Sequence, residues 1–305
     1  MHAEAEGNFA GKRLVVFGAG YLGGEFARQA RGRGLQVTAL TRNPITAAAL
    51  AAAGIEPVVG DLADDRWHAA IPGAADFVLN AVGSGGDGLP GYRRSYRDGM
   101  RSILAWARAR GAARVIAYTS STSVYPQDGG VRVDEHAAVS PRDERAAVLI
   151  ETEGLLRDAL AASGGAPVAA RACILRLAGL YGPGRHFLLD QIRRGEVAGS
   201  GEQHLNLIHR DDACAAVWAV FGAEVLAGTT VFNVADDTPL RKAEAVAWLA
   251  ARIGLPTPRF SGIPATGRRA ATPDRIILNT RLRTSLPWAP RFPSLREGYA
   301  NLLAG

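Results

Sequence analysis

The chain has 305 residues, 48% of them hydrophobic, which is enough for a large buried core and long for one ordinary domain. No apolar run approaches the roughly 20 residues that span a bilayer, and residues 1–12 lack the apolar segment of a secretory signal. Cys173 and Cys214 are the only cysteines, too few for a disulfide framework or a cysteine-rich metal site. We therefore expect a protein of the reducing cytoplasm, with no membrane partner and no metal.

The formal net charge is +6, and nearly all the cations are arginines, because Lys12 and Lys242 are the only lysines. The arginines are scattered along the chain without a basic run or interleaved aromatic residues, so we expect no nucleic-acid partner. Guanidinium groups bind phosphates and carboxylates well. The excess of arginines therefore indicates either an arginine-rich surface or contacts with an anionic ligand.

Short apolar segments alternate with helix-like segments through the first half of the chain. Strands are expected at residues 13–18, 36–41, 56–60, 76–82 and 114–120. Helices are expected at residues 20–33, 47–53 and 94–111. This alternation predicts an α/β fold of the Rossmann type, a doubly wound parallel sheet with helices on both faces.

The second half of the chain is less regular, with Gly/Pro-rich loops between its elements. Helices are expected at residues 141–162, 211–221, 241–253 and 295–304, and strands at 168–177 and 230–234. We expect a dinucleotide-binding Rossmann domain over residues 1–165. A smaller, mainly substrate-binding domain is expected over residues 166–305, interleaved with the late Rossmann strands.

A glycine motif, Gly18-Ala19-Gly20-Tyr21-Leu22-Gly23, follows the first strand and opens a helix. In this context Gly18 makes the tight turn, Gly20 lets the backbone approach a pyrophosphate, and Gly23 lets the helix pack on the strand. Free N–H groups at the helix start favour the phosphates. We expect Tyr21 and Leu22, in the same turn, to contact a nicotinamide dinucleotide as well.

The second strand ends in Leu40-Thr41-Arg42-Asn43. A carboxylate at this position binds the ribose hydroxyls of NAD, and none is present. A guanidinium can hold a 2′-phosphate with two hydrogen bonds, so Thr41 and Arg42 predict NADP(H) rather than NAD(H). The alternative is that Arg42 is a solvated arginine at a strand end.

Further segments resemble, in order along the chain, the extended and atypical short-chain dehydrogenase/reductases, the family of NAD-dependent epimerases and dehydratases. These segments are residues 60–62, 80–83, 119–125, 175–185, 206–212 and 232–234. The resemblance implies that Asp61 and Leu62 contact the adenine and that Ala81 and Val82 lie beside the ribose. It also implies that Ser121 is the catalytic serine.

The chain departs from this family at its acid/base pair. The family carries Tyr-x-x-x-Lys on the helix after the serine, and counting back from Glu153 places Arg145 and Leu149 at those two positions. Neither lysine of the chain has a tyrosine four residues before it. Arginine stays protonated and cannot shuttle a proton. The Arg-x-x-x-Leu pattern resembles an atypical bacterial subgroup of the family.

Other side chains are assigned roles on this resemblance. Tyr125 is a substitute proton donor, or else it packs its loop. The substrate contacts are expected at Ser121, Arg145, Tyr181 and Arg185.

We expect a reductase that transfers hydride between NADP(H) and a small carbonyl or imine substrate, with Ser121 donating a hydrogen bond to the reacting group. An iminium is already activated for hydride attack and demands less of an acid. The alternatives are a sugar-nucleotide epimerase or dehydratase and a non-catalytic NADP(H)-binding redox sensor. The partner of such a chain is a small-molecule substrate, and a homodimer is also expected.

Overall fold

The computed structural model describes residues 9–84, 86–162, 165–263 and 273–304. Two compact units emerge, and each consists of several stretches of chain. Unit 1 comprises Met1–Val124, Val139–Arg176 and Val217–Phe232, and unit 2 comprises Tyr125–Ala138, Leu177–Ala216 and Asn233–Gly305. The chain thus passes between the two units several times. No helix in the described ranges is both long and apolar enough to cross a membrane.

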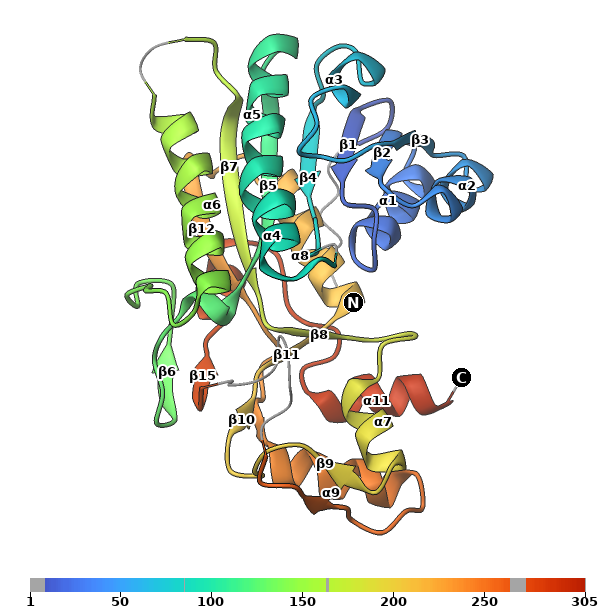
Figure 1. Cartoon of the computed structure of the whole chain (residues 1–305), viewed down its shortest axis with the longest axis vertical. Coiled ribbons are helices and arrows are strands. Elements are labelled where there is room, and N and C mark those ends of the chain that lie inside the picture. Colours follow the sequence, from blue (N-terminus) through green and yellow to red (C-terminus); the bar gives the residue numbers. More distant parts are fainter. Residues whose placement is uncertain (1–8, 85, 163–164, 264–272, 305) are drawn as a thin grey trace. The chain divides into compact units, whose positions relative to one another are not determined.

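A seven-stranded sheet runs through unit 1 (Figure 1), in the order β12-β7-β5-β4-β1-β2-β3. Its strands are β1 (Arg13–Phe17), β2 (Gln36–Thr41), β3 (Glu56–Val59), β4 (Phe77–Asn80), β5 (Ala113–Ser121), β7 (Ala169–Leu177) and β12 (Gly228–Val234). The predicted strand at residues 36–41 coincides with β2, and the doubly wound α/β fold is confirmed.

Strand β1 lies between β2 and β4 and is parallel to both, with Val15 opposite Thr38 on one side and Val78 on the other. The chain continues from β1 to β2 and β3 in one direction, and β4 and β5 extend the sheet in the other. The strand order therefore reverses between β1 and β4. In open α/β sheets, ligands bind beyond the carboxyl ends of the strands at such a switch point.

One face of the sheet is covered by α3 (Trp67–Ala70), α5 (Gly99–Arg110) and α6 (Glu144–Ala161). Trp67, Trp106 and Leu156 from these helices pack on strand residues such as Phe17 and Ile116, and all five are nearly inaccessible to solvent. Burial of these apolar side chains removes them from water, which is the main favourable term in folding.

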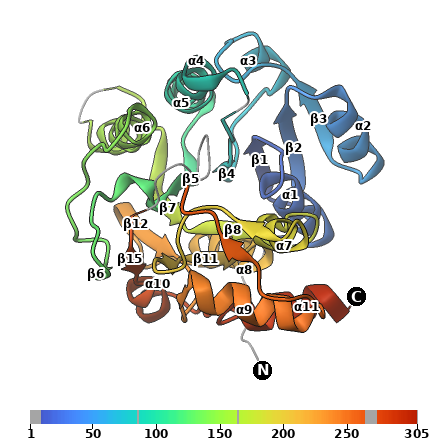
Figure 2. The same ribbon diagram turned by 60° about the horizontal axis from the view of Figure 1, so that its bottom comes forward.

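The opposite face of unit 1 is aromatic as well. Phe26 of α1 (Gly23–Gly32) packs on Trp218 and Phe221 in the C-terminal part of α8 (Arg210–Gly222), and Phe221 stacks on Phe77 of β4. Figure 2 shows α1 and α8 on one side of the sheet and α5 and α6 on the other. Helix α2 (Pro44–Ala52) connects β2 to β3.

The helix expected at residues 94–111 is longer and interrupted. It begins as α4 (Gly88–Arg93), continues through a π-helical turn, η1 (Arg94–Asp98), and ends as α5. A π turn widens the helix locally, and such turns are frequent at functional sites.

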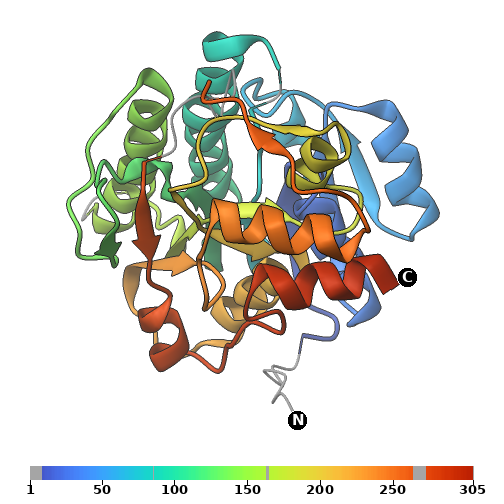
Figure 3. The same cartoon turned by 90° about the horizontal axis from the view of Figure 1, so that it is seen from below.

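Unit 2 is built on a small helical core. Its helices include α7 (Phe187–Arg193), α9 (Lys242–Arg252), α10 (Thr280–Ser285) and α11 (Leu295–Ala304), and Figure 3 shows α9 and α11 side by side. Leu189, Val246 and Tyr299 belong to the cluster of buried side chains that joins α7, α9 and α11.

Short strand pairs complete unit 2. They are β8 (Gly179–Tyr181) with β11 (Leu207–His209), β9 (Glu196–Val197) with β14 (Arg259–Phe260), β10 (His204–Leu205) with β13 (Leu240–Arg241), and β6 (Val131–Val133) with β15 (Arg275–Ile277). Each is two or three residues long, which is too short for a sequence pattern to reveal.

Candidate functional site

The glycine motif forms the turn between β1 and α1. Gly18 has φ of +87°, and a Cβ on it would lie 2.6 Å from the Val82 Cα atom. A Cβ on Gly23 would lie 2.3 Å from the Gly18 carbonyl oxygen, so both positions require glycine for the fold itself. A Cβ on Gly20 would meet no described atom within 4 Å. Gly20 is therefore not needed for packing and leaves open space beside the turn.

The start of α1 lies next to this open space. Its first flanking residue, Leu22, makes no capping hydrogen bond through its side chain. The Gly24 amide donates to the Gly20 carbonyl oxygen at 2.8 Å, and the first amides of a helix in general have no partner within the helix. Such amides carry a partial positive charge and bind phosphate groups. The open space at Gly20 and this uncapped helix start fit a dinucleotide pyrophosphate.

The end of β2 lies at the same edge of the sheet. Thr41 is buried, and its Oγ1 accepts a hydrogen bond from the Asn43 amide at 3.2 Å. The Asn43 side chain caps α2 by accepting from the Ile45 amide at 2.8 Å. Between them Arg42 is exposed. The backbone here is fixed on both sides, so Arg42 is presented from a rigid position.

The end of β3 carries Asp61. Its Oδ1 accepts from the Ala63 amide at 3.0 Å, and its Oδ2 accepts from the Arg94 Nε at 2.7 Å. Burial alone would raise the pKa of Asp61, but these hydrogen bonds and the charges of Arg94 and Arg42 outweigh burial, so the pKa is lowered. Leu62 beside it is buried. Sequence reasoning missed Arg94, because no motif marks it and only the π turn places it against Asp61.

Ala81 and Val82 follow β4 and are half-buried, and the Ala81 amide donates to the Phe17 carbonyl oxygen at 2.8 Å. The preceding Asn80 is fully buried, and its Nδ2 has no hydrogen-bond partner among the described residues. Thus the cofactor residues predicted from sequence in the segments around positions 18–23, 41–42, 61–62 and 81–82 all lie at the carboxyl ends of β1 to β4.

Ser121 is the last residue of β5 and is half-buried, and its Oγ accepts from the Ser123 amide at 3.1 Å. Its neighbour Ser120 is buried and donates to Glu153 Oε1 at 2.7 Å. Successive side chains of a strand point to opposite faces. Glu153 therefore fixes the strand through Ser120 and leaves the Ser121 hydroxyl directed elsewhere.

Helix α6 carries the two positions at which the family has tyrosine and lysine. Asp143 caps its start by accepting from the Ala146 amide at 2.7 Å. Arg145, in the first turn, is half-buried, whereas Leu149 is 1% exposed and belongs to the interior. The helix packs against the 3-10 turn at Thr122–Val124 that follows Ser121. Ser121 and Arg145 therefore belong to adjoining elements of unit 1.

Tyr125 lies in unit 2 and is fully buried. Its hydroxyl donates to Asn233 Oδ1 at 2.8 Å, and Asn233 Nδ2 donates to the carbonyl oxygens of Val133 and Leu278. This hydrogen-bonded hydroxyl joins three segments of unit 2. Of the two interpretations of Tyr125, its geometry favours packing of the loop over proton donation.

Tyr181 is also a core residue of unit 2. It is 4% exposed, and its ring stacks on Tyr299 with the centroids 5.3 Å apart. Burial, reinforced by the nearby carboxylates Asp236 and Asp212, raises the pKa of its hydroxyl. Arg185 is exposed on the loop after β8. The substrate-contact roles of Tyr181 and Arg185 stay predictions, and the burial of Tyr181 argues against its part.

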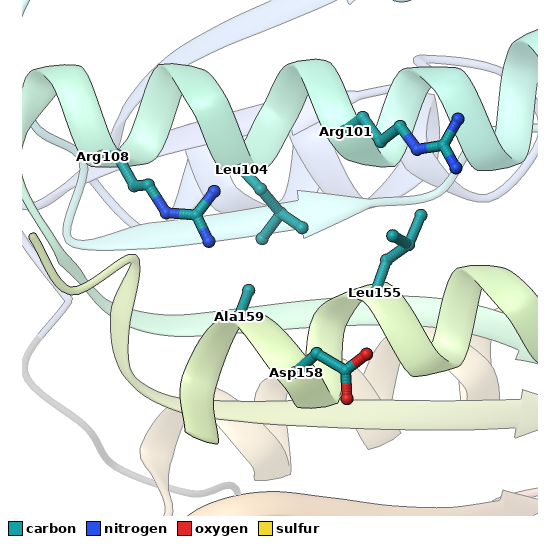
Figure 4. Close-up of a pocket in the computed structure, with 6 residues that line it drawn as sticks. All are labelled: Arg101, Leu104, Arg108, Leu155, Asp158 and Ala159. Carbon is teal, nitrogen blue, oxygen red and sulfur yellow. The ribbon is translucent and has the colours of Figure 1, made fainter. Parts of the chain in front are cut away.

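A groove lies between α5 and α6 on the outer side of unit 1 (Figure 4). It is lined by Arg101, Leu104, Arg108, Leu155, Asp158 and Ala159. None of these is a predicted cofactor or substrate residue. The expected homodimer stays a prediction.

Comparison with known proteins gives independent evidence about the family of this chain. The sequence profile of the NAD dependent epimerase/dehydratase family matches residues 14–235. Protein YeeZ of Escherichia coli (strain K12) is 29% identical over 291 residues, covering 92% of this chain and 97% of that protein. A 3-diazoavenalumate denitrifying reductase of Streptomyces sp is 29% identical over 312 residues, covering 94% and 98%.

Among solved structures, the fold matches a double mutant of DesIV, a dTDP-glucose 4,6-dehydratase from Streptomyces venezuelae determined with NAD bound. The TM-score is 0.78 at 19% identity, with 96% of each chain covered. At this identity the likeness shows the fold alone.

Proposed function

The chain belongs to the NAD dependent epimerase/dehydratase family, and from this premise we propose that it is an NADP(H)-dependent reductase of a small carbonyl or imine substrate. The observation that carries the proposal is the edge of the sheet where β1 to β4 end. There an open glycine turn, an uncapped helix and the exposed Arg42 occur together. No carboxylate ends β2.

Each part of this edge has a role toward the cofactor. Gly18, Gly20 and Gly23 would hold the pyrophosphate at the start of α1, and Arg42 would bind the 2′-phosphate. The half-buried backbone at Ala81 and Val82 would lie beside the ribose. A reduced nicotinamide supplies hydride to an electrophilic carbon.

The reaction follows from what unit 1 offers and lacks. The Ser121 hydroxyl can donate a hydrogen bond to the heteroatom of a substrate, and Arg145 can attract an anionic one. Leu149, a core residue, cannot tune any acid. An iminium carbon accepts hydride while its electron pair moves onto nitrogen, giving the amine with no proton transfer in that step. A carbonyl needs a proton donor as well, so the missing tyrosine and lysine favour the imine.

The relative from Streptomyces supports this direction. It is named as a reductase of 3-diazoavenalumate, a substrate that carries a diazo group, with nitrogen chemistry related to that of an imine. We therefore propose that the substrate already carries an activated nitrogen group, an iminium or a diazo group, when it binds.

The cofactor assignment is tested by calorimetric titration with NADPH and NADH. Arg42→Ala should weaken NADPH binding by roughly 1–3 kcal/mol, the range for hydrogen bonds to a charged group, and change NADH little. Arg108→Ala, an exposed arginine of the α5–α6 groove, is the control and should leave both unchanged. Equal affinity of the wild type for the two cofactors would remove NADP(H) from the proposal.

The reaction is tested by following NADPH oxidation over a panel of imines, diazo compounds, ketones and aldehydes. On any substrate found, Ser121→Ala should lower kcat by roughly tenfold or more and leave NADPH affinity nearly intact, because the bond is made mainly in the transition state. Ser123→Ala, an exposed serine two residues on, is the control. Full activity of Ser121→Ala would exclude the serine from the mechanism.

Two other functions are tested by adding sugar nucleotides to this panel, with analysis of the products as well as of NADPH oxidation. Turnover of a sugar nucleotide would favour an epimerase or dehydratase, for which the fold of DesIV is the supporting likeness. Tight NADPH binding without turnover of any compound would favour a redox sensor.

A further inference from the structure

Arg94 makes an ion pair that no motif predicts. Its Nε lies 2.7 Å from Asp61 Oδ2, with 53% of the Arg94 side chain and 28% of the Asp61 side chain exposed. Its two terminal nitrogens make no hydrogen bond with any described residue. The π turn η1 carries this guanidinium to the loop after β3. Arg94 is therefore held at one nitrogen and keeps two donors toward solvent.

Asp61 is a close neighbour of Arg42 through the backbone. Thr41 pairs with Val59 in the parallel ladder of β2 and β3, and the Gly60 amide donates to the Thr41 carbonyl oxygen at 3.0 Å. Arg42 follows Thr41 and Asp61 follows Gly60, and the charge of Arg42 acts on the Asp61 carboxylate. An unpaired carboxylate at Asp61 would repel a phosphate that approaches Arg42. A cation that pairs with the carboxylate reduces this repulsion.

The other acids of this loop are paired too. Asp64 accepts from Arg66, and Asp65 accepts from the Ser102 hydroxyl with His68 3.4 Å away. Of these three acids, Asp61 alone pairs with a cation from outside the loop, Arg94.

We propose that Arg94 is a specificity-determining residue for the cofactor: it neutralises Asp61 and so permits a doubly charged 2′-phosphate beside Arg42. The inference rests on the proposed function, since it concerns the same cofactor. It assigns to a pair of side chains, rather than to Arg42 alone, the discrimination between NADP(H) and NAD(H).

The test is a double-mutant cycle in the full chain, read as the dissociation constants of NADPH and NADH and of the fragments adenosine 2′,5′-bisphosphate and AMP. Arg94→Ala should weaken NADPH and the bisphosphate roughly tenfold, the size of one unscreened charge contact, and change NADH and AMP little. Asp61→Asn keeps the Oδ1 acceptor for Ala63. In the double variant it should restore most of the lost NADPH affinity.

Salt and a neighbouring arginine serve as controls. The effect of Arg94→Ala should shrink in 0.5 M salt, because the Debye length falls to a few ångströms, about 3 Å at 1 M. Arg93→Ala, whose guanidinium pairs with Glu144 at 3.1 Å, should not alter the ratio of the two cofactor affinities.

The outcomes separate the two proposals. If the wild type binds NADH as tightly as NADPH, the cofactor assignment fails and the role of Arg94 falls with it. If the wild type prefers NADPH but Arg94→Ala weakens both cofactors equally, or Asp61→Asn restores nothing, the inference alone is overturned. Thermal unfolding of each variant confirms that the comparison is between folded proteins.

Discussion

The three glycines of the motif at residues 18–23 have different structural roles. Gly18 and Gly23 lie where a Cβ would collide with backbone, whereas Gly20 faces open space. A motif read from sequence treats the three alike, because it records only residue type and spacing. Their separate roles come from the packing of the turn on Val82 and on the Gly18 carbonyl oxygen.

Gly20→Val should therefore abolish NADPH binding while leaving the thermal unfolding temperature within a few degrees of the wild type. Its side chain enters the space proposed for the pyrophosphate, and a Cβ at this position meets no described atom within 4 Å. Gly23→Ala should instead destabilise the fold, since its Cβ has only 2.3 Å to the Gly18 carbonyl oxygen. Binding titrations and thermal melts of the two variants check this contrast. Retained binding by a folded Gly20→Val protein would mean that the turn does not hold the cofactor.

At the scale of elements, α6 is tied to the sheet by a buried charge cluster. Glu153 is fully buried and accepts from Ser120, from Arg157 at 2.9 Å and from Arg176 at 3.0 and 2.7 Å. Arg176 is itself 2% exposed. Such a pair adds little net stability over an apolar one, but removing one partner leaves an uncompensated charge.

Glu153→Gln should accordingly lower the free energy of unfolding by about 3–5 kcal/mol. Glu151→Gln, on the same helix, removes an exposed pair with Arg101 and should cost at most about 1 kcal/mol. Urea unfolding of both variants measures the difference. Similar losses for the two would show that the Glu153 cluster does not hold α6 in place.

The sequence indicated most elements of unit 1 and fewer of unit 2. Apolar runs revealed β1 to β5 because buried parallel strands are continuously hydrophobic. The helix starting at Gly88 was missed because its first four residues, Gly-Leu-Pro-Gly, are rich in poor helix formers. Strands such as β6 and β15 are three residues long and pair across most of the second half of the chain. No local pattern specifies such a pairing.

The residues of the candidate site were likewise predicted better in unit 1 than in unit 2. Residues at the ends of β1 to β4 were found from motifs, since each motif lies next to its strand. Arg94 was not predicted, because only the π turn brings it to Asp61. The burial of Tyr125 and Tyr181 was not predicted either, because it depends on hydrogen bonds and ring stacking within unit 2. Sequence distance from a motif does not reveal whether a hydroxyl is accessible.

At the scale of the whole molecule, the fold raises the pKa values of two buried carboxyl groups in unit 2, Asp212 and Asp236. Asp212 accepts from the amides of Arg291 at 2.7 Å and Phe292 at 3.0 Å. Burial outweighs these bonds and raises the pKa of Asp212 to about 6, and burial raises the pKa of Asp236 as well. A group with a raised pKa binds its proton more tightly in the folded state than in the unfolded state.

The folded protein should therefore gain stability from Asp212 as the pH falls from 7.5 through 6 toward 4.5, and lose it as the pH rises. Burial lowers the pKa of His209, which acts in the opposite direction. The informative quantity is thus the melting temperature of the wild type minus that of Asp212→Asn. This difference should increase as the pH is lowered. A difference that is flat between pH 7.5 and 4.5 would show that Asp212 titrates at its ordinary pKa.

The interleaving of the two units also bears on how the chain is made. Unit 1 needs residues 217–232 to finish its sheet, and by then the ribosome has already produced the middle stretch of unit 2. Strand β6 waits longer, because its partner β15 begins only at Arg275. Neither unit can be completed as a nascent domain before the other has begun.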